Sequence, residues 1–303
     1  MSAPLTYEVR HSTRYNYGGE VAHAHQLLHL TPRETPTQHT EGHAILVRPV
    51  ALLRATHEDA FGNAVTRLEL DRPHRELEII ASMRVRVSPP PFIDAAATLP
   101  WEEVAAQLRY QPEPCPAEQL DALRFRWASP YVPVKAVFAA YARECFAAGA
   151  PLLACAEKLM HRIHHDFRYV PGATQISTPL LEVLAGREGV CQDFAHVMIA
   201  ALRSLGLAAR YVSGYLRTRP PEGEPGRIGA DASHAWVSVY VPPLGWVDLD
   251  PTNNLRVAQE HVVLAWGRDF GDVSPLRGVL LGGGSHQLTV GVSVTEAVDD
   301  IEP

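Results

Sequence analysis

The sequence lacks several features that would place it in a membrane, secretory or nucleic-acid-binding class. No stretch approaches the ~20 uninterrupted apolar residues that a membrane helix needs, and the N-terminus has no apolar run of signal-peptide length. Lys and Arg form no cluster of five or more, and the formal net charge is −7. We therefore expect a cytoplasmic protein that has no dedicated surface for nucleic acid or for an anionic membrane.

Cysteine is scarce, and its spacing excludes the common thiol motifs. The four cysteines are Cys115, Cys145, Cys155 and Cys191, and none forms a C-x-x-C pair. A zinc or thioredoxin-type motif is therefore absent, and in a reducing cytosol the thiols should stay free. Cys145 and Cys155 lie in Ala/Leu-rich helical sequence and are expected in the core, because an isolated cysteine usually behaves as a small buried hydrophobe.

Signals for a cofactor or a metal are also weak. The glycine triplet at 282–284 is not followed by Lys-Ser/Thr, so it is expected to be a loop and not a phosphate cradle. His161 and His165 have the i, i+4 spacing of a helical zinc site, but the glutamate of an H-E-x-x-H motif is missing and no third ligand is evident. We therefore expect no cofactor and no metal.

The patterning indicates two parts joined by a proline-rich segment, in an α+β protein. Alternating apolar and polar residues predict strands of an antiparallel sheet or sandwich up to residue 90, with turns at Tyr17–Gly19 and Phe61–Asn63. The proline-rich residues 91–133 indicate a connecting segment, with one short helix predicted at 101–108. From 134 to 303 the pattern is helical and then returns to strands at 209–216, 235–241, 246–249 and 287–294. The expected domains are 1–90 and 134–303.

Cys191 stands out because of the helix that follows it. An apolar stripe repeats at helical spacing, made of Phe194, Met198, Ala201 or Leu202, and Leu205, and Gly206 is expected to cap the helix end. Cys191 should then lie at the helix N-terminus, where unpaired N–H groups and the helix dipole favour a thiolate and can stabilise an oxyanion. The alternative is a core cysteine that happens to begin a helix.

The segments 234–241 and 246–250 supply groups that could assist such a thiol. The turn between them predicts an antiparallel hairpin, and pairing Tyr240 with Trp246 keeps the polar and aromatic side chains on one face. Asp250 is then the diagonal neighbour of His234, within side-chain reach, and could orient the imidazole. Asp248 lies one step further away and is the weaker candidate. A histidine at a strand end is otherwise more often structural.

These three segments resemble the three blocks of the transglutaminase-like superfamily in order and spacing. The blocks are 189–196, 234–236 and 245–253, and 167–172 resembles the lead-in to the first of them. Residues 5–85 resemble the β-rich N-terminal domain of bacterial members, and 267–278 resembles a further block of that subgroup. The resemblance implies an N-terminal β-sandwich-like domain followed by a papain-like core of helices packed on an antiparallel sheet.

The resemblance also implies roles for individual residues. Cys191 would be the nucleophile, His234 the general base and acid, and Asp250 the third member of the triad. The Gln that papain-like enzymes carry six residues before the nucleophile is replaced by Ala185. Oxyanion or supporting roles are therefore open to five other residues: Tyr169, Gln175, Gln192, Asp193 and Trp236. Asp193 could equally serve as an N3 residue that bonds the start of the helix.

The expected function is that of a cysteine-dependent amide-bond enzyme acting through a thioester on a peptide or protein. Hydrolysis is preferred to acyl transfer, because nothing in the chain marks an amine-acceptor site and a cytosolic crosslinker would be hazardous. A non-catalytic binding or scaffold protein on the same fold is the remaining alternative. The sequence determines neither the substrate nor the oligomeric state.

Overall fold

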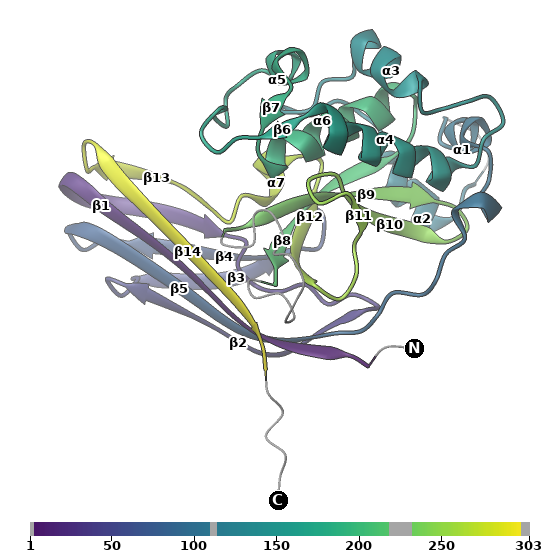
Figure 1. The fold of residues 1–303 in the computed structure, drawn as a ribbon. Helices are drawn as coiled ribbons and strands as arrows, with labels where there is room; N and C mark the ends of the chain where they lie inside the picture. Colours follow the sequence, from purple (N-terminus) through teal and green to yellow (C-terminus); the bar gives the residue numbers. More distant parts are fainter. Residues whose placement is uncertain (1–2, 110–113, 218–231, 298–303) are drawn as a thin grey trace, which may run out of the picture.

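The N-terminal strands form one antiparallel sheet that curves into a half-barrel (Figure 1). The computed structural model describes residues 3–109, 114–217 and 232–297. Seven strands belong to this sheet: β1 (Leu5–Leu28), β2 (Gln38–Arg48), β3 (Leu53–Glu58), β4 (Ala64–Leu70), β5 (His74–Val87), β13 (Leu276–Gly282) and β14 (His286–Glu296). The sheet that the sequence predicts up to residue 90 is present.

The long strand β1 organises this sheet. Along its first half β1 pairs with β5 and β14, and along its second half it pairs with β4 and β13. The last two strands of the chain therefore lie beside the first one (Figure 1). The expected division placed 276–296 with the second domain, whereas these residues pair with the N-terminal sheet. The boundaries of the two domains stay a proposal.

The predicted turn at Tyr17–Gly19 is wrong, because these residues lie inside β1. The pairing of β1 with β5 is irregular between Asn16 and Val21, and here the strand bends. The N–H groups of Gly18 and Gly19 donate to the carbonyls of Ser285 and Gly283, at 2.7 and 2.8 Å. The C-terminal part of the chain therefore satisfies backbone groups that a local turn would otherwise have paired.

A second antiparallel sheet carries the rest of the fold. Its strand order is β11-β10-β9-β8-β12. The bounds are β8 (Ala209–Leu216), β9 (His234–Val241), β10 (Gly245–Asp250), β11 (Leu255–Arg256) and β12 (His261–Gly267), and a separate parallel pair joins β6 (Arg168–Tyr169) to β7 (Glu188–Gly189). The helices are α1 (Trp101–Gln107), α2 (Ala117–Leu123), α3 (Ala136–Arg143), α4 (Leu152–Asp166), α5 (Leu180–Gly186), α6 (Cys191–Ser204) and α7 (Phe270–Val273), with a 3₁₀ turn at Ala95–Ala97.

Helix α6 lies at the centre of this second part. It packs on β8 and β9, and α3, α4 and α5 contact its other sides (Figure 1). Every residue from Asp193 to Arg203 is buried, so the helix is enclosed well beyond the single stripe that the sequence predicted. Gly206 ends it as expected: its φ is 86°, and Leu207 N–H donates to the Leu202 carbonyl at 3.1 Å. The predicted α+β class is confirmed.

Hydrogen bonds fasten the two sheets to each other. Tyr215 on β8 bonds His11 on β1 at 2.9 Å, and the Gln38 side chain bonds both backbone groups of Val263 on β12. Strand β12 therefore lies where the N-terminal sheet meets the second part. Among the helices that the structure describes, none is long and apolar enough to span a membrane.

Candidate active site

Cys191 is the first residue of α6, and its side chain is buried with 8% of its surface exposed. The first carbonyl acceptor of α6 is that of Val190, to which the N–H groups of Asp193 and Phe194 donate. The N–H groups of Cys191 and Gln192 lie before these donors and have no acceptor within the helix, so they can bind an anion. Asp193 accepts a hydrogen bond from the Val190 N–H at 2.9 Å, and the Thr174 hydroxyl donates to the same carboxylate at 2.6 Å. Asp193 is therefore an N3 capping residue that also ties the 170–179 loop to the helix start.

Gly189 is required by the close approach of Asp193 and not by a turn. Its φ lies outside the left-handed region, whereas Arg187 has a φ of 56°. A Cβ added to Gly189 would lie 2.5 Å from Asp193 Oδ2. A side chain at position 189 would therefore displace the carboxylate that caps the helix start.

The predicted hairpin register is confirmed: Tyr240 pairs with Trp246. His234 begins β9 and Asp250 ends β10, and His234 Nε2 lies 2.8 Å from Asp250 Oδ2. The other ring nitrogen, Nδ1, is buried and has no hydrogen-bond partner within the described ranges. Burial opposes protonation of His234, but the Asp250 carboxylate and the Cys191 thiol outweigh it and raise the pKa of His234 to about 10.

Asp250 is fully buried and is surrounded by donors. Its Oδ1 accepts from the backbone N–H groups of Thr252 and Asn253, at 2.9 and 3.1 Å. Its Oδ2 accepts from the Asn253 side-chain amide at 2.8 Å in addition to His234. Burial alone would raise the pKa of this carboxyl, but His234, and the hydrogen bonds that the carboxylate accepts, hold it well below its usual range.

Asp248 and Trp236 form a separate pair. The Trp236 indole N–H donates to Asp248 Oδ2 at 3.0 Å, so Asp248 is engaged away from His234. The plane of the Trp236 ring is inclined by 29° to that of the His234 ring, with centroids 6.2 Å apart. Trp236 is therefore placed as a wall of the site, and its N–H is not available to an oxyanion.

His261 is a neighbour of the site that the sequence did not indicate. It begins β12, its side chain is buried, and its Nε2 lies 3.2 Å from Asp250 Oδ2. Burial lowers the pKa of His261, with Asp250 acting in the opposite direction. No local pattern marks His261, because it reaches Asp250 through the tertiary fold.

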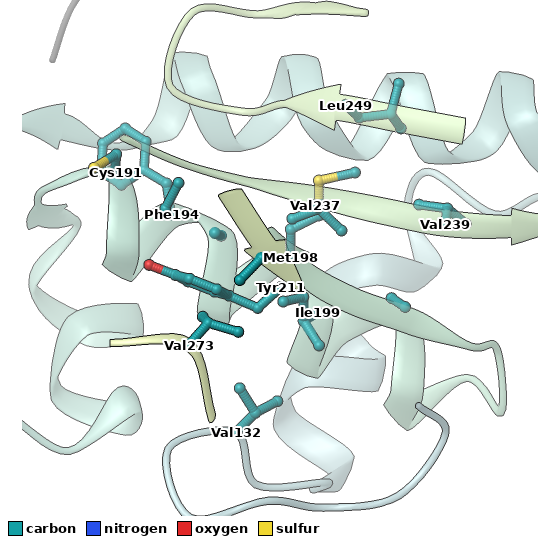
Figure 2. Packing of buried hydrophobic residues seen from close by; sticks show 14 of the residues in the cluster. Val132, Cys191, Phe194, Met198, Ile199, Tyr211, Val237, Val239, Leu249 and Val273 are labelled. Carbon is teal, nitrogen blue, oxygen red and sulfur yellow. The ribbon is translucent and has the colours of Figure 1, made fainter. Parts of the chain in front are cut away.

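Tyr211 on β8 is a second neighbour that the sequence did not indicate. Figure 2 shows its ring beneath α6, with the hydroxyl directed toward the end of the helix that carries Cys191. Burial raises the pKa of Tyr211 far above its usual range, and Cys191 adds to this effect. The other expected supporting residues are less enclosed: Tyr169 packs edge-on against Phe194, Gln192 is half-buried, and Gln175 is exposed.

A metal is not needed to explain the grouping of these side chains. The ligand atoms of His234, Asp250 and His261 lie within 4.8 Å of one another. Both imidazoles bond the same carboxylate oxygen, which accounts for their proximity. At the other histidine pair, His161 is bonded to Asn254, and no third ligand lies near His161 and His165 in the part of the chain that the structure describes.

A separate cavity of about 570 Å³ lies elsewhere, where β1 and β3 meet the 268–277 segment. It is lined by charged and apolar side chains, among them Arg124, Arg268, Arg277, Asp59 and Phe61, and by none of the residues around Cys191. This cavity is thus distinct from the cysteine site.

Comparisons with known proteins find matches along most of the chain. Residues 7–86 match the bacterial transglutaminase-like N-terminal region, and residues 139–251 match the transglutaminase-like superfamily. An uncharacterized protein of Mycobacterium tuberculosis is 39% identical over 298 residues, covering 92% of this chain and 90% of that protein. A protein-glutamine gamma-glutamyltransferase of Pseudomonas aeruginosa is 32% identical over 111 residues, which are 34% of this chain and 16% of that enzyme.

The fold also has a solved counterpart. A crystal structure of a candidate cysteine protease from Cytophaga hutchinsonii superposes with a TM-score of 0.75 and covers 100% of this chain and 94% of that one. The two sequences are 19% identical, so this likeness concerns the fold.

Proposed function

Because the chain belongs to the transglutaminase-like superfamily, we propose that it is an amide-bond enzyme in which Cys191, His234 and Asp250 form the catalytic triad. The observation that carries this proposal is the pairing of His234 Nε2 with Asp250, which leaves Nδ1 unpaired beside the thiol at the start of α6. Membership of this family supports a cysteine-dependent enzyme.

In the first half of the reaction, His234 Nδ1 takes the proton of the Cys191 thiol, and the sulfur attacks the carbonyl carbon of an amide. The carbonyl oxygen becomes an oxyanion, which the N–H groups of Cys191 and Gln192 stabilise at the positive end of the helix dipole. His234 donates a proton from Nδ1 to the departing nitrogen, and the C–N bond breaks to leave a thioester on Cys191. Asp250 stabilises the imidazolium before this transfer and holds the ring in place.

In the second half, His234 acts as a base. It takes a proton from water, the resulting hydroxide attacks the thioester, and the C–S bond breaks to release a carboxylic acid and restore the thiol. An amine in place of water would give a new amide. We favour hydrolysis of a peptide or protein, in the cytoplasm, and the similarity to a gamma-glutamyltransferase supports acyl transfer as the second candidate.

The first test measures thiol reactivity. Iodoacetamide should label Cys191 far faster than Cys145 or Cys155, whose thiol pKa values are raised by burial. His234→Ala should slow the labelling of Cys191 alone. Equal and slow labelling of these cysteines would instead support a non-catalytic protein on the same fold.

The second test separates hydrolysis from transfer. A peptide library is incubated with the protein or with Cys191→Ala, with and without a primary amine, and the products are identified by mass spectrometry. A free acid that needs Cys191 identifies a hydrolase, and an amine adduct that needs Cys191 identifies a transferase.

A further inference from the structure

His261 lies against Asp250 but belongs to neither the hairpin nor the helix that carry the proposed triad. Its side chain is almost completely buried, with 2% of the residue exposed. Its ring packs edge-on against the Trp236 ring, with 5.1 Å between the two ring centroids. Its Nε2 lies 3.2 Å from Asp250 Oδ2, the one polar contact of the His261 ring among the residues that the structure describes. His261 Nδ1 is buried and has no hydrogen-bond partner in the described ranges.

These contacts determine where the proton of His261 resides. Asp250 is ionised and can only accept, so His261 Nε2 must carry the hydrogen. The charged or titratable groups that face His261 are Asp250 on β10, His234 on β9 and the adjacent Glu260. Burial and the charge on His234 favour the neutral imidazole, whose Nδ1 then presents an unprotonated lone pair to the protein interior.

Burying that lone pair without a partner is unfavourable, and an apolar side chain of similar size would avoid it. The feature that distinguishes His261 from such a side chain is its N–H donor to Asp250. Oδ2 is also the oxygen that orients His234, whereas Oδ1 is bonded to the backbone of Thr252 and Asn253. The donor from His261 therefore acts on the catalytically relevant side of the carboxylate.

We propose that His261 is a positioning residue that fixes Asp250 Oδ2, so that the His234 ring keeps Nδ1 turned toward Cys191. This inference rests on the proposed function, because it concerns the alignment of the same site. His261 itself does not touch the substrate or the reacting sulfur. A carboxylate whose two oxygens both accept hydrogen bonds is held against rotation, and the imidazole bonded to it keeps one orientation.

The contact between His261 and Asp250 depends on close packing around Gly214 on β8. Residues 251–260 carry the chain from β10 to β12, and at Gly214 strand β8 pairs with His234 on one side and Val263 on the other. A Cβ added to Gly214 would lie 2.1 Å from the Val262 carbonyl oxygen and 2.5 Å from the Trp236 ring. The absence of a side chain at Gly214 thus lets β12 and Trp236 approach closely enough for His261 to reach Asp250.

The test compares two substitutions in the full-length protein. His261→Phe keeps a ring against Trp236 but removes the donor, and His261→Gln keeps an N–H donor of similar reach. The readout is the rate of Cys191 alkylation by iodoacetamide at pH 7, measured site by site, with melting temperature as a check on folding. A matched control is His29→Phe, because His29 is equally buried but bonds the Ser274 carbonyl.

We expect His261→Phe to slow the labelling of Cys191 by roughly ten- to hundredfold, the range that misalignment of a reacting group produces. His261→Gln should recover most of the rate, and His29→Phe should leave it unchanged at a comparable melting temperature. Equal rates in the wild type and His261→Phe would overturn the positioning role while leaving the proposed function intact. A rate in His261→Gln as low as in His261→Phe would assign His261 a packing role only.

Wild-type labelling that is no faster at Cys191 than at Cys145 would remove the proposed function and this inference together. A measurement on the unmodified protein covers the case in which His261→Phe does not fold. Nitrogen-15 NMR should show His261 as a neutral ring with the proton on Nε2. A proton on Nδ1 in place of Nε2 would contradict the donor role.

Discussion

The ion pair between His234 and Asp250 makes a strong prediction about stability. Asp250→Asn keeps the shape of the side chain but removes its charge and replaces one acceptor oxygen with an amide donor. That amide would face N–H groups of His234 and Asn253 or of the backbone, all of which now donate to Asp250. Removing one partner from a buried ion pair costs about 3–5 kcal/mol, which for a protein of this size lowers the melting temperature by about 6–10 °C.

The same ion pair sets the pH range in which this loss is seen. The folded-state pKa of His234 is raised from 6.5 to about 10, so its contribution is complete below pH 6.5 and is lost as the pH rises toward 10. A rise of that size corresponds to about 5 kcal/mol. The lowered pKa of Asp250 reflects the same ion pair, so the two contributions to stability are not added. Protonation of Asp250 weakens the ion pair only at acidic pH.

Thermal unfolding of the wild type and Asp250→Asn at pH 6, 8 and 10 tests this reasoning. The difference in melting temperature should be largest at pH 6 and smallest at pH 10. Asp248→Asn is the matched control for loss of a carboxylate from the same strand, because Asp248 bonds Trp236 and not His234. A difference for Asp250→Asn that stays constant from pH 6 to pH 10 would refute a charged His234 in the folded state.

Three further substitutions follow from the same structure. Gly214→Ala should destabilise the protein by more than about 2 kcal/mol in urea unfolding, because its Cβ would overlap the Val262 carbonyl; Gly186→Ala, which faces open space, should change stability by less than about 1 kcal/mol. Asp193→Ala removes the cap of α6 and should lower the free energy of unfolding by about 1 kcal/mol. It should also slow the labelling of Cys191. An unchanged labelling rate would show that the reactivity of the thiol does not depend on this cap.

Much of the candidate site was predictable because it depends on local patterns. The 3.6-residue period after Cys191 indicated α6, and the period of two on either side of the 242–245 turn indicated the β9–β10 hairpin. A hairpin has few registers that keep polar and apolar faces apart, so Asp250 could be assigned to His234 before any tertiary contact was known.

The extent to which α6 is buried could not be predicted from the periodicity of its sequence. One apolar stripe was expected, yet the helix is buried nearly all around because α3, α4 and α5 cover the sides away from the sheet. Likewise, the close contact of Gly189 with Asp193 depends on the folded helix start. Local sequence indicates which residues are unusual, and three-dimensional packing gives the reason.

The sequence by itself determined the α+β class, the helix that begins at Cys191 and the pairing of His234 with Asp250, because each depends on residues close together in the chain. Only the tertiary structure placed His261 on Asp250 and joined β13 and β14 to β1. These contacts connect strands that are not sequence neighbours, and no short-range periodicity encodes them. They form because buried polar groups and strand edges need partners, which the rest of the fold supplies.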